Sequence, residues 1–260
     1  MISKTPLTLF YNYIHIIILT VIFIIFLSIL IYLYVNFPPL LDNEKKILKL
    51  PTSIDDAKSL GKLLSAYQNN YYYYLLFVFA LSYIFLQTFA IPGSLFLNVL
   101  SGYLYSFPLA LLLVCTCSSI GASLCYFLSN FAGKKLINYY FPNHISDLSA
   151  KVNKHRSNIL NYIIFLRITP ILPNWLINLV CPILNIPLKP YFIGTFLGVA
   201  PPSILAIQMG KTLLNMTAYP DDDTNNNSIF DLKSMAFLLI CALFSLLPLV
   251  FKHRFSQKFD

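Results

Sequence analysis

The sequence predicts an all-α polytopic membrane protein, with five to six transmembrane helices and two re-entrant helical hairpins that face each other as an inverted repeat. Composition is the first observation behind this prediction: 57% of the 260 residues are hydrophobic and 11% are charged. Soluble domains carry about 25% charged residues. The charges are too few to cover a water-exposed surface, which excludes a soluble enzyme, a disordered chain, a coiled coil and a disulfide scaffold. Long uncharged runs and two interrupted apolar segments are the other observations.

The first apolar run extends from Tyr13 to Val35, and its only ionisable group besides tyrosines is His15. About 20 helical residues cross the hydrocarbon core of a bilayer. The run lacks the short apolar stretch and the small-residue cleavage site of a cleaved signal peptide. We therefore expect residues 1–36 to form a retained transmembrane helix that ends at the prolines 38 and 39.

Residues 37–70 are predicted to form an amphipathic linker on the membrane surface. Ser53 can cap a helix whose first turn holds Asp55 and Asp56. The apolar residues that follow recur at helical spacing, which is typical of a helix that lies on a membrane.

The core is predicted over residues 71–251 and combines complete spans with broken ones. Two segments contain too many breaks and too few residues to cross a bilayer, and each is expected to dip in and return to the same side. These re-entrant segments lie near 91–107 and 159–187. The expected complete spans are 71–90, 108–131, 190–210 and 234–251, followed by a basic tail at 252–260.

The two broken segments resemble each other. The stretch from Pro92 to Gly102 aligns with the stretch from Pro173 to Pro182 with one gap, and Pro108 and Pro190 then open complete spans. Paired interrupted segments in matching positions of two halves are typical of transporters that carry a site near the membrane midplane.

The positive charges predict an orientation. Most of the 18 Lys and Arg residues lie in the loops 42–70 and 133–158 and in the tail, which a five-crossing topology puts on one side. The positive-inside rule makes that side cytosolic, which includes the C-terminus. The sequons at Asn215 and Asn226 then face the lumen. The net charge of +8 is assigned to these loops and to anionic lipid head groups, so no nucleic-acid partner is expected.

Arg167 is the leading candidate for a functional residue. A charge at membrane depth costs from about 3 to more than 10 kcal/mol and usually marks function. No Asp or Glu lies between Asp56 and Asp147, or between Asp147 and Asp221. The expected partners are backbone carbonyls, side-chain amides or an external anion, and a phospholipid phosphate fits a guanidinium bidentately. A compatible alternative is that Arg167 caps carbonyls of the opposite re-entrant loop.

The neutral polar residues of the broken segments are expected either to satisfy interrupted backbone or to form a polar path for a lipid head group. The candidate groove residues are Gln87, Pro92, Gly93, Ser94, Asn98, Gly102, Pro170, Pro173, Asn174 and Asn178. We expect Trp175 to be an interfacial or packing aromatic. No metal site, cofactor or catalytic residue is predicted, because the sequence contains no ligand cluster and no nucleophile with a base nearby.

Three strings resemble the VTT or DedA family of membrane proteins: FLQTFAIPGS (85–94), NYIIFLRITPILPNW (161–175) and FIGTFLGVAPPS (192–203). The resemblance covers about residues 70–251. It implies a phospholipid scramblase of the endoplasmic reticulum, needed for autophagosome formation and lipid mobilisation, with two re-entrant loops that face one another. It also implies phospholipids and sterol as lipid partners, and autophagy or lipoprotein proteins of the endoplasmic reticulum as protein partners.

Some features of this chain depart from the family pattern. Arg167 and Pro170 match the family's aromatic-x-x-Arg-x-x-Pro motif, but the aromatic position is shifted. Bacterial relatives carry an acidic residue near the first re-entrant loop, where this chain has Gln87 and Ser94. Family members are described with both termini cytosolic, whereas five crossings leave Met1 lumenal.

Three functional hypotheses follow. The leading one is an energy-independent scramblase, since the sequence has no nucleotide-binding motif. The second is an ion-coupled carrier of lipids or metabolites, which the missing carboxylates disfavour. The third is a non-transporting scaffold for autophagy or lipoprotein partners.

Overall fold

The computed structural model describes residues 6–37, 54–133, 152, 156–169 and 172–218. Within these ranges the regular structure is helical, and no strand occurs. The long helices are α1 (Pro6–Val35), α3 (Ile54–Thr88), α5 (Phe107–Leu128) and α10 (Leu188–Ala218). The short helices are α4 (Ser94–Leu104), α8 (Ile159–Ile168) and α9 (Asn174–Ile183), with a π-helical turn η1 (Ser129–Gly133) and a 3-10 turn η2 (Arg156–Asn158).

Four described segments are long and apolar enough to cross a membrane. They are Ile17–Val35, Asn70–Thr88, Phe107–Phe131 and Leu188–Leu214. This confirms the prediction of an all-helical, multi-pass membrane protein and the positions of four of the five expected spans. The fifth span at 234–251, the basic tail and residues 38–53 of the linker lie outside the described residues.

The expected linker helix and the second span form one helix. Helix α3 starts at Ile54 and continues to Thr88, with non-helical dihedral angles at Tyr71 (φ −129°, ψ 34°). The polar part of the linker therefore continues into the apolar part through a kink.

The backbone conformation of the turn between α3 and α4 requires the glycine found in the first broken segment. Gly93 caps α4 with φ 143°, a conformation that residues with a side chain rarely adopt. Ala90 also has a positive φ, and the amide of Ile91 donates to the carbonyl of Leu86 at 2.8 Å, which closes the end of α3. Helix α3 therefore ends at Thr88 and a separate short helix starts at Ser94.

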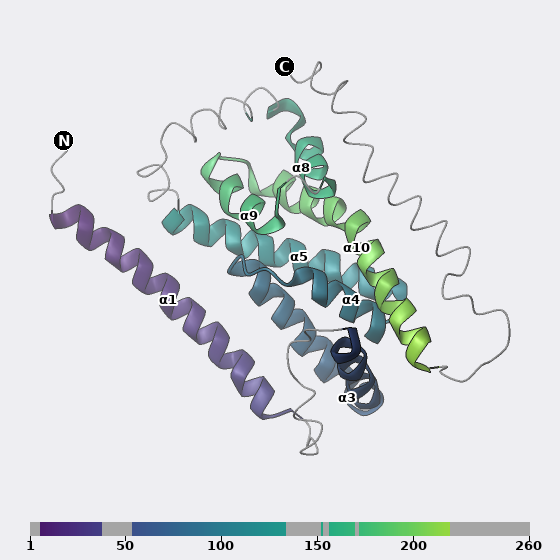
Figure 1. The fold of residues 1–260 in the computed structure, drawn as a ribbon. Helices are drawn as coiled ribbons and strands as arrows, with labels where there is room; N and C mark the ends of the chain where they lie inside the picture. The colour runs from purple at the N-terminus through teal and green to yellow at the C-terminus, as the bar shows by residue number, and fades with distance from the viewer. Residues whose placement is uncertain (1–5, 38–53, 134–151, 153–155, 170–171, 219–260) are drawn as a thin grey trace.

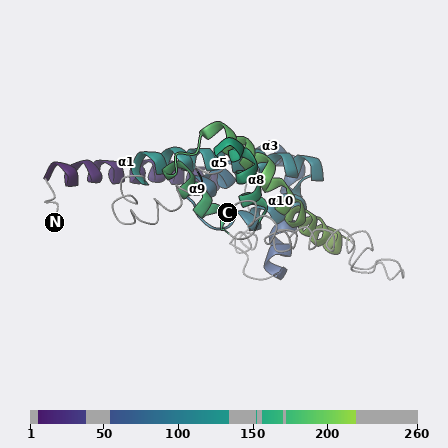
Figure 2. The same cartoon turned by 90° about the horizontal axis from the view of Figure 1, so that it is seen from above.

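Helices α5 and α10 form the centre of the fold (Figures 1 and 2). Helix α10 packs against α4, α5 and α8, while α5 packs against α3, α9 and α10. In the N-terminal half (α3–α5), α4 packs on α3 and α5 and also on α10 of the C-terminal half (α8–α10). Helix α9 of the C-terminal half packs on α5 and η1, and its Asn178 side chain bonds to α8 and α10. Helix α1 lies at the side of this bundle and contacts α3 and η1.

Two apolar clusters flank the centre. One gathers residues of α3, α4, α5 and α10, including Phe79, Tyr83 and Ile207. The other gathers residues of α5, α8, α9 and α10, including Ile163 and Ile177. Buried polar residues lie between these two apolar clusters.

Candidate functional site

Arg167 lies in the last turn of α8 and is 3% exposed. One guanidinium nitrogen, Nη2, donates to Asn178 Oδ1 at 2.6 Å, to the Tyr191 hydroxyl at 3.0 Å and to Thr195 Oγ1 at 3.1 Å. The other, Nη1, donates to Oδ1 and to the backbone carbonyl of Asn174 at 3.2 and 3.4 Å. The guanidinium also lies 5.5 Å from the centroid of the Tyr191 ring. The cation is therefore enclosed by neutral acceptors from α9 and α10.

Glycines in α10 allow α8 to approach closely enough to place this side chain. A Cβ at Gly198 would lie 2.6 Å from the Cβ of Arg167, and one at Gly194 would lie 2.9 Å from the side chain of Ile163. Because the helices approach closely, the stem of Arg167 lies between them and its head points to the N-terminal turns of α9 and α10.

No carboxylate balances this charge in the described structure. The described residues include only two acids, Asp55 and Asp56, both at the start of α3. In addition, Arg167 Nε is buried without a hydrogen-bond partner. A buried cation with only neutral partners keeps much of its desolvation cost, which a second charge of opposite sign would reduce.

Gln87 connects this cluster to the other half of the molecule. Asn178 donates through Nδ2 to Gln87 Oε1 at 3.0 Å, and Gln87 donates through Nε2 to Ser118 Oγ at 3.3 Å. The Tyr191 hydroxyl donates to Asn178 Oδ1 at 2.9 Å. These contacts fix the orientation of the Asn178 amide, because its nitrogen faces Gln87 and its oxygen faces Arg167.

We call this set the polar cluster: Gln87, Ser118, Arg167, Asn174, Asn178, Tyr191 and Thr195. Four of these residues were singled out from the sequence, namely Gln87, Arg167, Asn174 and Asn178. Tyr191, Thr195 and Ser118 were missed. They lie within regular spans, where one hydroxyl gives no sequence signal.

The remaining predicted groove residues lie elsewhere. Asn98 Nδ2 donates to Ser203 Oγ at 3.2 Å, and its Oδ1 is buried without a partner. Gly102 lies at the contact of α4 with α10. Pro92 and Gly93 lie in the turn before α4, Ser94 is the first residue of α4, and Pro173 is the N-cap of α9.

Pro170 lies outside the described residues. Trp175 is 41% exposed on α9 and is absent from the polar cluster. The alternative role predicted for Arg167, capping carbonyls of the opposite loop, also differs in detail. Its one backbone acceptor, Asn174, belongs to its own half.

The surroundings of Gln87 and Arg167 are alike. The sequences Ile84-Phe-Leu-Gln87 and Ile164-Phe-Leu-Arg167 differ only in the last residue. Each last residue lies over a glycine: a Cβ at Gly121 would be 2.5 Å from the Cβ of Gln87, as one at Gly198 would be 2.6 Å from that of Arg167. Each also donates to a hydroxyl three residues before that glycine, on Ser118 or on Thr195.

The fold and the polar cluster together define a class: a helical, multi-pass membrane protein that encloses one arginine among neutral groups. The VTT domain model matches residues 91–212, which include α4, α5, α8, α9 and most of α10. The described residues contain no group of three His, Cys, Asp or Glu that could hold a metal ion.

Sequence comparison with individual relatives shows which family within this class the chain resembles. The chain is 50% identical over 239 residues to human "Transmembrane protein 41B", which covers 91% of this chain and 80% of the human protein. It is 49% identical over 243 residues to the chicken protein of the same name, covering 94% and 88%. It is 48% identical over 237 residues to the Drosophila melanogaster "Transmembrane protein 41 homolog", covering 91% and 72%. The chain belongs to the transmembrane protein 41 family of VTT-domain proteins. No solved structure matches it significantly.

Proposed function

We propose that this chain is an energy-independent phospholipid scramblase of the endoplasmic reticulum membrane, which supports autophagosome formation and lipid mobilisation. One observation carries the proposal: a guanidinium buried among apolar helices has only neutral partners. A phosphodiester is the anion that the surrounding membrane supplies in excess, and its paired oxygens match a guanidinium.

The proposal includes two re-entrant hairpins related by an inverted repeat. Three features support it. Helices α4, α8 and α9 have 10 or 11 residues, too few to cross a bilayer. Each of α4 and α9 packs on a long span of the other half. Finally, Gln87 and Arg167 end nearly identical tetrapeptides and have similar neighbours. In a repeat of this kind the binding site lies where the two halves meet.

The polar cluster suits exchange of a phosphate against neutral groups. To reach Arg167, a phosphate must displace hydroxyl and amide oxygens and need not separate an ion pair. The displaced contacts have a charged donor and a neutral acceptor, whereas a phosphate adds a second charge and binds the guanidinium bidentately. The guanidinium is enclosed in this structure, so helix α9 must move away from α8 when a head group enters. The acyl chains stay in the lipid.

The hypothesis of an ion-coupled carrier has less support. Carriers driven by protons or sodium place Asp, Glu or His within the membrane. In the described helices the only acids are Asp55 and Asp56, which precede the apolar part of α3.

A non-transporting scaffold has one observation in its favour. Arg167 has five hydrogen-bond contacts and joins α8 to α9 and α10. A purely structural role would require no ligand. On this hypothesis the loss of Arg167 lowers stability and leaves no separate effect on lipid movement.

Reconstitution separates these hypotheses. Purified protein is incorporated into liposomes with fluorescent phospholipids, and dithionite then bleaches the outer leaflet. We expect wild-type protein to expose nearly all of the label, without a nucleotide, proton gradient or sodium gradient. Arg167→Gln should slow this exchange strongly, and Lys211→Gln should not. Lys211 is a suitable control because it is a second cation near the membrane core and contacts Phe107 instead of the polar cluster.

Three results would oppose the proposal. Lipid exchange in liposomes with wild-type protein that equals the exchange in empty liposomes would refute the scramblase hypothesis. Exchange that requires an ion gradient supports the carrier. If Arg167→Gln loses thermal stability and exchanges lipid at the wild-type rate per folded molecule, Arg167 is structural.

A further inference from the structure

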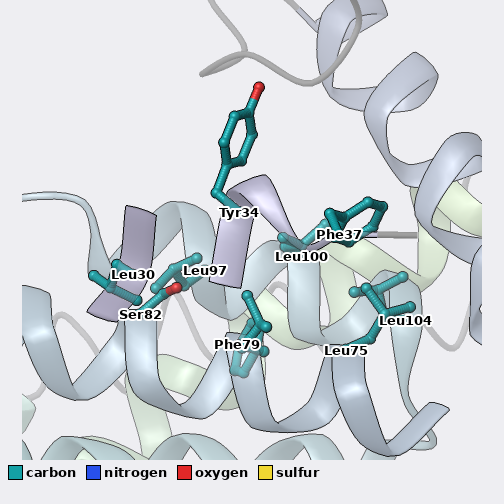
Figure 3. A pocket seen from close by; sticks show the side chains of 10 residues that line it. Leu30, Tyr34, Phe37, Leu75, Phe79, Ser82, Leu97, Leu100 and Leu104 are labelled. Carbon is teal, nitrogen blue, oxygen red and sulfur yellow. The ribbon is translucent and has the colours of Figure 1, made fainter. Parts of the chain in front are cut away.

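An apolar cavity lies between α1 and the core, away from the polar cluster. It has a volume of about 330 Å³, and its walls come from α1, α3 and α4. Figure 3 shows the lining side chains, with the ring of Tyr34 directed away from Phe79. Eight of the ten lining residues are Leu, Val or Phe, and the two polar side chains are Ser82 and Tyr34.

Aromatic contacts on both sides of the cavity hold α1 against α3. On one side, the Phe23 ring lies 4.9 Å from Phe89 and 5.5 Å from Phe85, measured between centroids. On the other, Phe37 lies 5.9 Å from Tyr74, whose hydroxyl donates to the backbone carbonyl of Leu33. The cavity therefore results from fixed contacts at both ends of the gap.

The cavity suits a hydrocarbon. Dry apolar cavities of roughly 150 Å³ in proteins take up small apolar molecules rather than water, and this one is about twice as large. Only two lining residues could hydrogen-bond a water molecule. The outer side of α1 is exposed, with Ile29 at 45% and Tyr32 at 67%. Because α1 is long and apolar enough to span a membrane, we expect that side to face lipid.

The lining also argues against a polar or charged occupant, because it offers two hydroxyl groups and no charged side chain. A flexible chain of methylene groups can enter such a space, and the surrounding bilayer supplies it.

We propose that this cavity binds one acyl chain of a membrane phospholipid, which fills the space between α1 and helices α3 and α4. The bound acyl chain packs against α1 on one side and against α3 and α4 on the other, which stabilises the contact between α1 and the core. The proposal does not depend on lipid scrambling, since the cavity lies apart from Arg167.

The test is photocrosslinking in proteoliposomes. A phospholipid with a diazirine on one acyl chain is activated by light, and the labelled peptides are identified by mass spectrometry. Two variants fill the cavity from different walls: Ser82→Phe from α3 and Leu100→Trp from α4. Leu112→Trp is the matched control, because Leu112 is 56% exposed on α5 and does not line the cavity.

We expect wild-type adducts to concentrate on peptides that contain residues 30–37, 75–82 and 97–104. A side chain that excludes about two methylene groups should lower these adducts about tenfold in either filling variant, with no change in the control. Unlabelled phospholipid should compete with the probe in wild-type protein. This competition needs no variant and so remains informative if a substitution prevents folding.

Several results would overturn the proposal. Adducts spread evenly over all lipid-facing helices, and unchanged by Ser82→Phe, would indicate only annular lipid. Competition by a sterol at concentrations where phospholipid has no effect would assign the cavity to sterol. Lipid adducts that are absent from the cavity peptides but present on the other lipid-facing helices would show that an acyl chain does not enter the cavity. The acyl-chain proposal and the proposed function are tested separately. Normal labelling of the cavity peptides in an Arg167→Gln variant that does not exchange lipid would support the acyl-chain proposal independently of the scramblase proposal.

Discussion

The contact between α4 and α10 makes a strong prediction for Gly102→Ala. A Cβ at position 102 would lie 2.0 Å from the backbone oxygen of Ile207, 2.7 Å from its carbonyl carbon and 2.8 Å from its Cα. Real Cβ atoms essentially never come within 3.0 Å of such neighbours, and backbone atoms cannot rotate away. The two helices must therefore separate by at least 1 Å along this contact.

The separation would also reach the next turn of α4. Asn98, four residues earlier, donates to Ser203 of α10 at 3.2 Å, and a shift of this size breaks that bond. Overpacking costs about 1–3 kcal/mol and a buried hydrogen bond about 1 kcal/mol, which predicts a loss of about 2–4 kcal/mol. For a chain of this size the melting temperature should fall by roughly 5–15 °C.

Thermal unfolding in detergent, followed by size-exclusion chromatography, measures this effect. Leu95→Ala is the control, because Leu95 is 67% exposed on the same helix. Gly210→Ala tests the contact from the other helix, since a Cβ there would lie 1.9 Å from the oxygen of Val99. Alanine is a better helix former than glycine by about 1 kcal/mol, so without a close contact Gly102→Ala would stabilise the protein. An equal or higher melting temperature would therefore refute the close approach.

Three further predictions concern the polar cluster and the cysteines. Arg167→Gln should lower the free energy of unfolding by about 1–3 kcal/mol, because it leaves buried acceptors unpaired. If the two positions are equivalent, adding Gln87→Arg should recover part of this loss. Additive losses in thermal unfolding would contradict that equivalence. Gln87→Glu keeps the bond from Asn178 and adds a carboxylate beside the polar cluster. We therefore expect unchanged or higher thermal stability and slower lipid exchange. Lipid exchange at the wild-type rate would argue against phosphate binding at Arg167. In a Cys241→Ser chain, a maleimide should label no thiol of the folded protein and four thiols after denaturation in SDS. The reason is that the four remaining cysteines, Cys115, Cys117, Cys125 and Cys181, are buried. Rapid labelling of the folded protein would show that the two halves separate.

The helical elements were largely predictable from the sequence. The broken segment expected near 91–107 contains the short helix Ser94–Leu104, and the expected span at 108–131 corresponds to Phe107–Phe131. These boundaries were accurate because Pro and Gly have strong local effects: they remove a donor or permit a positive φ, independently of packing. Continuity was harder to predict. The bend at Tyr71 joins two segments with different polarity, and polarity alone does not show whether a helix continues.

The polar cluster was only partly predictable. Arg167 and the neighbouring amides were apparent because buried charge and broken helices are rare in membranes. Thr195 was not, since a threonine hydroxyl in a long helix usually bonds to its own backbone, as Thr212 does to Gln208. Tyr191 was not, since it is one of 18 tyrosines in the chain. Only the packing of α8 on α10 shows that these two hydroxyls contact a guanidinium instead.

The difference between Gln87 and Arg167 fits the proposed transport. A site on a transport path must bind its substrate strongly enough to admit it and weakly enough to release it. Two arginines in equivalent positions would hold a phosphate between them and would repel each other when it left. One arginine beside a glutamine of similar placement offers a charged contact followed by a neutral one. Asn178 touches both residues, with Oδ1 toward Arg167 and Nδ2 toward Gln87, so one amide could contact a head group throughout its passage between the two halves.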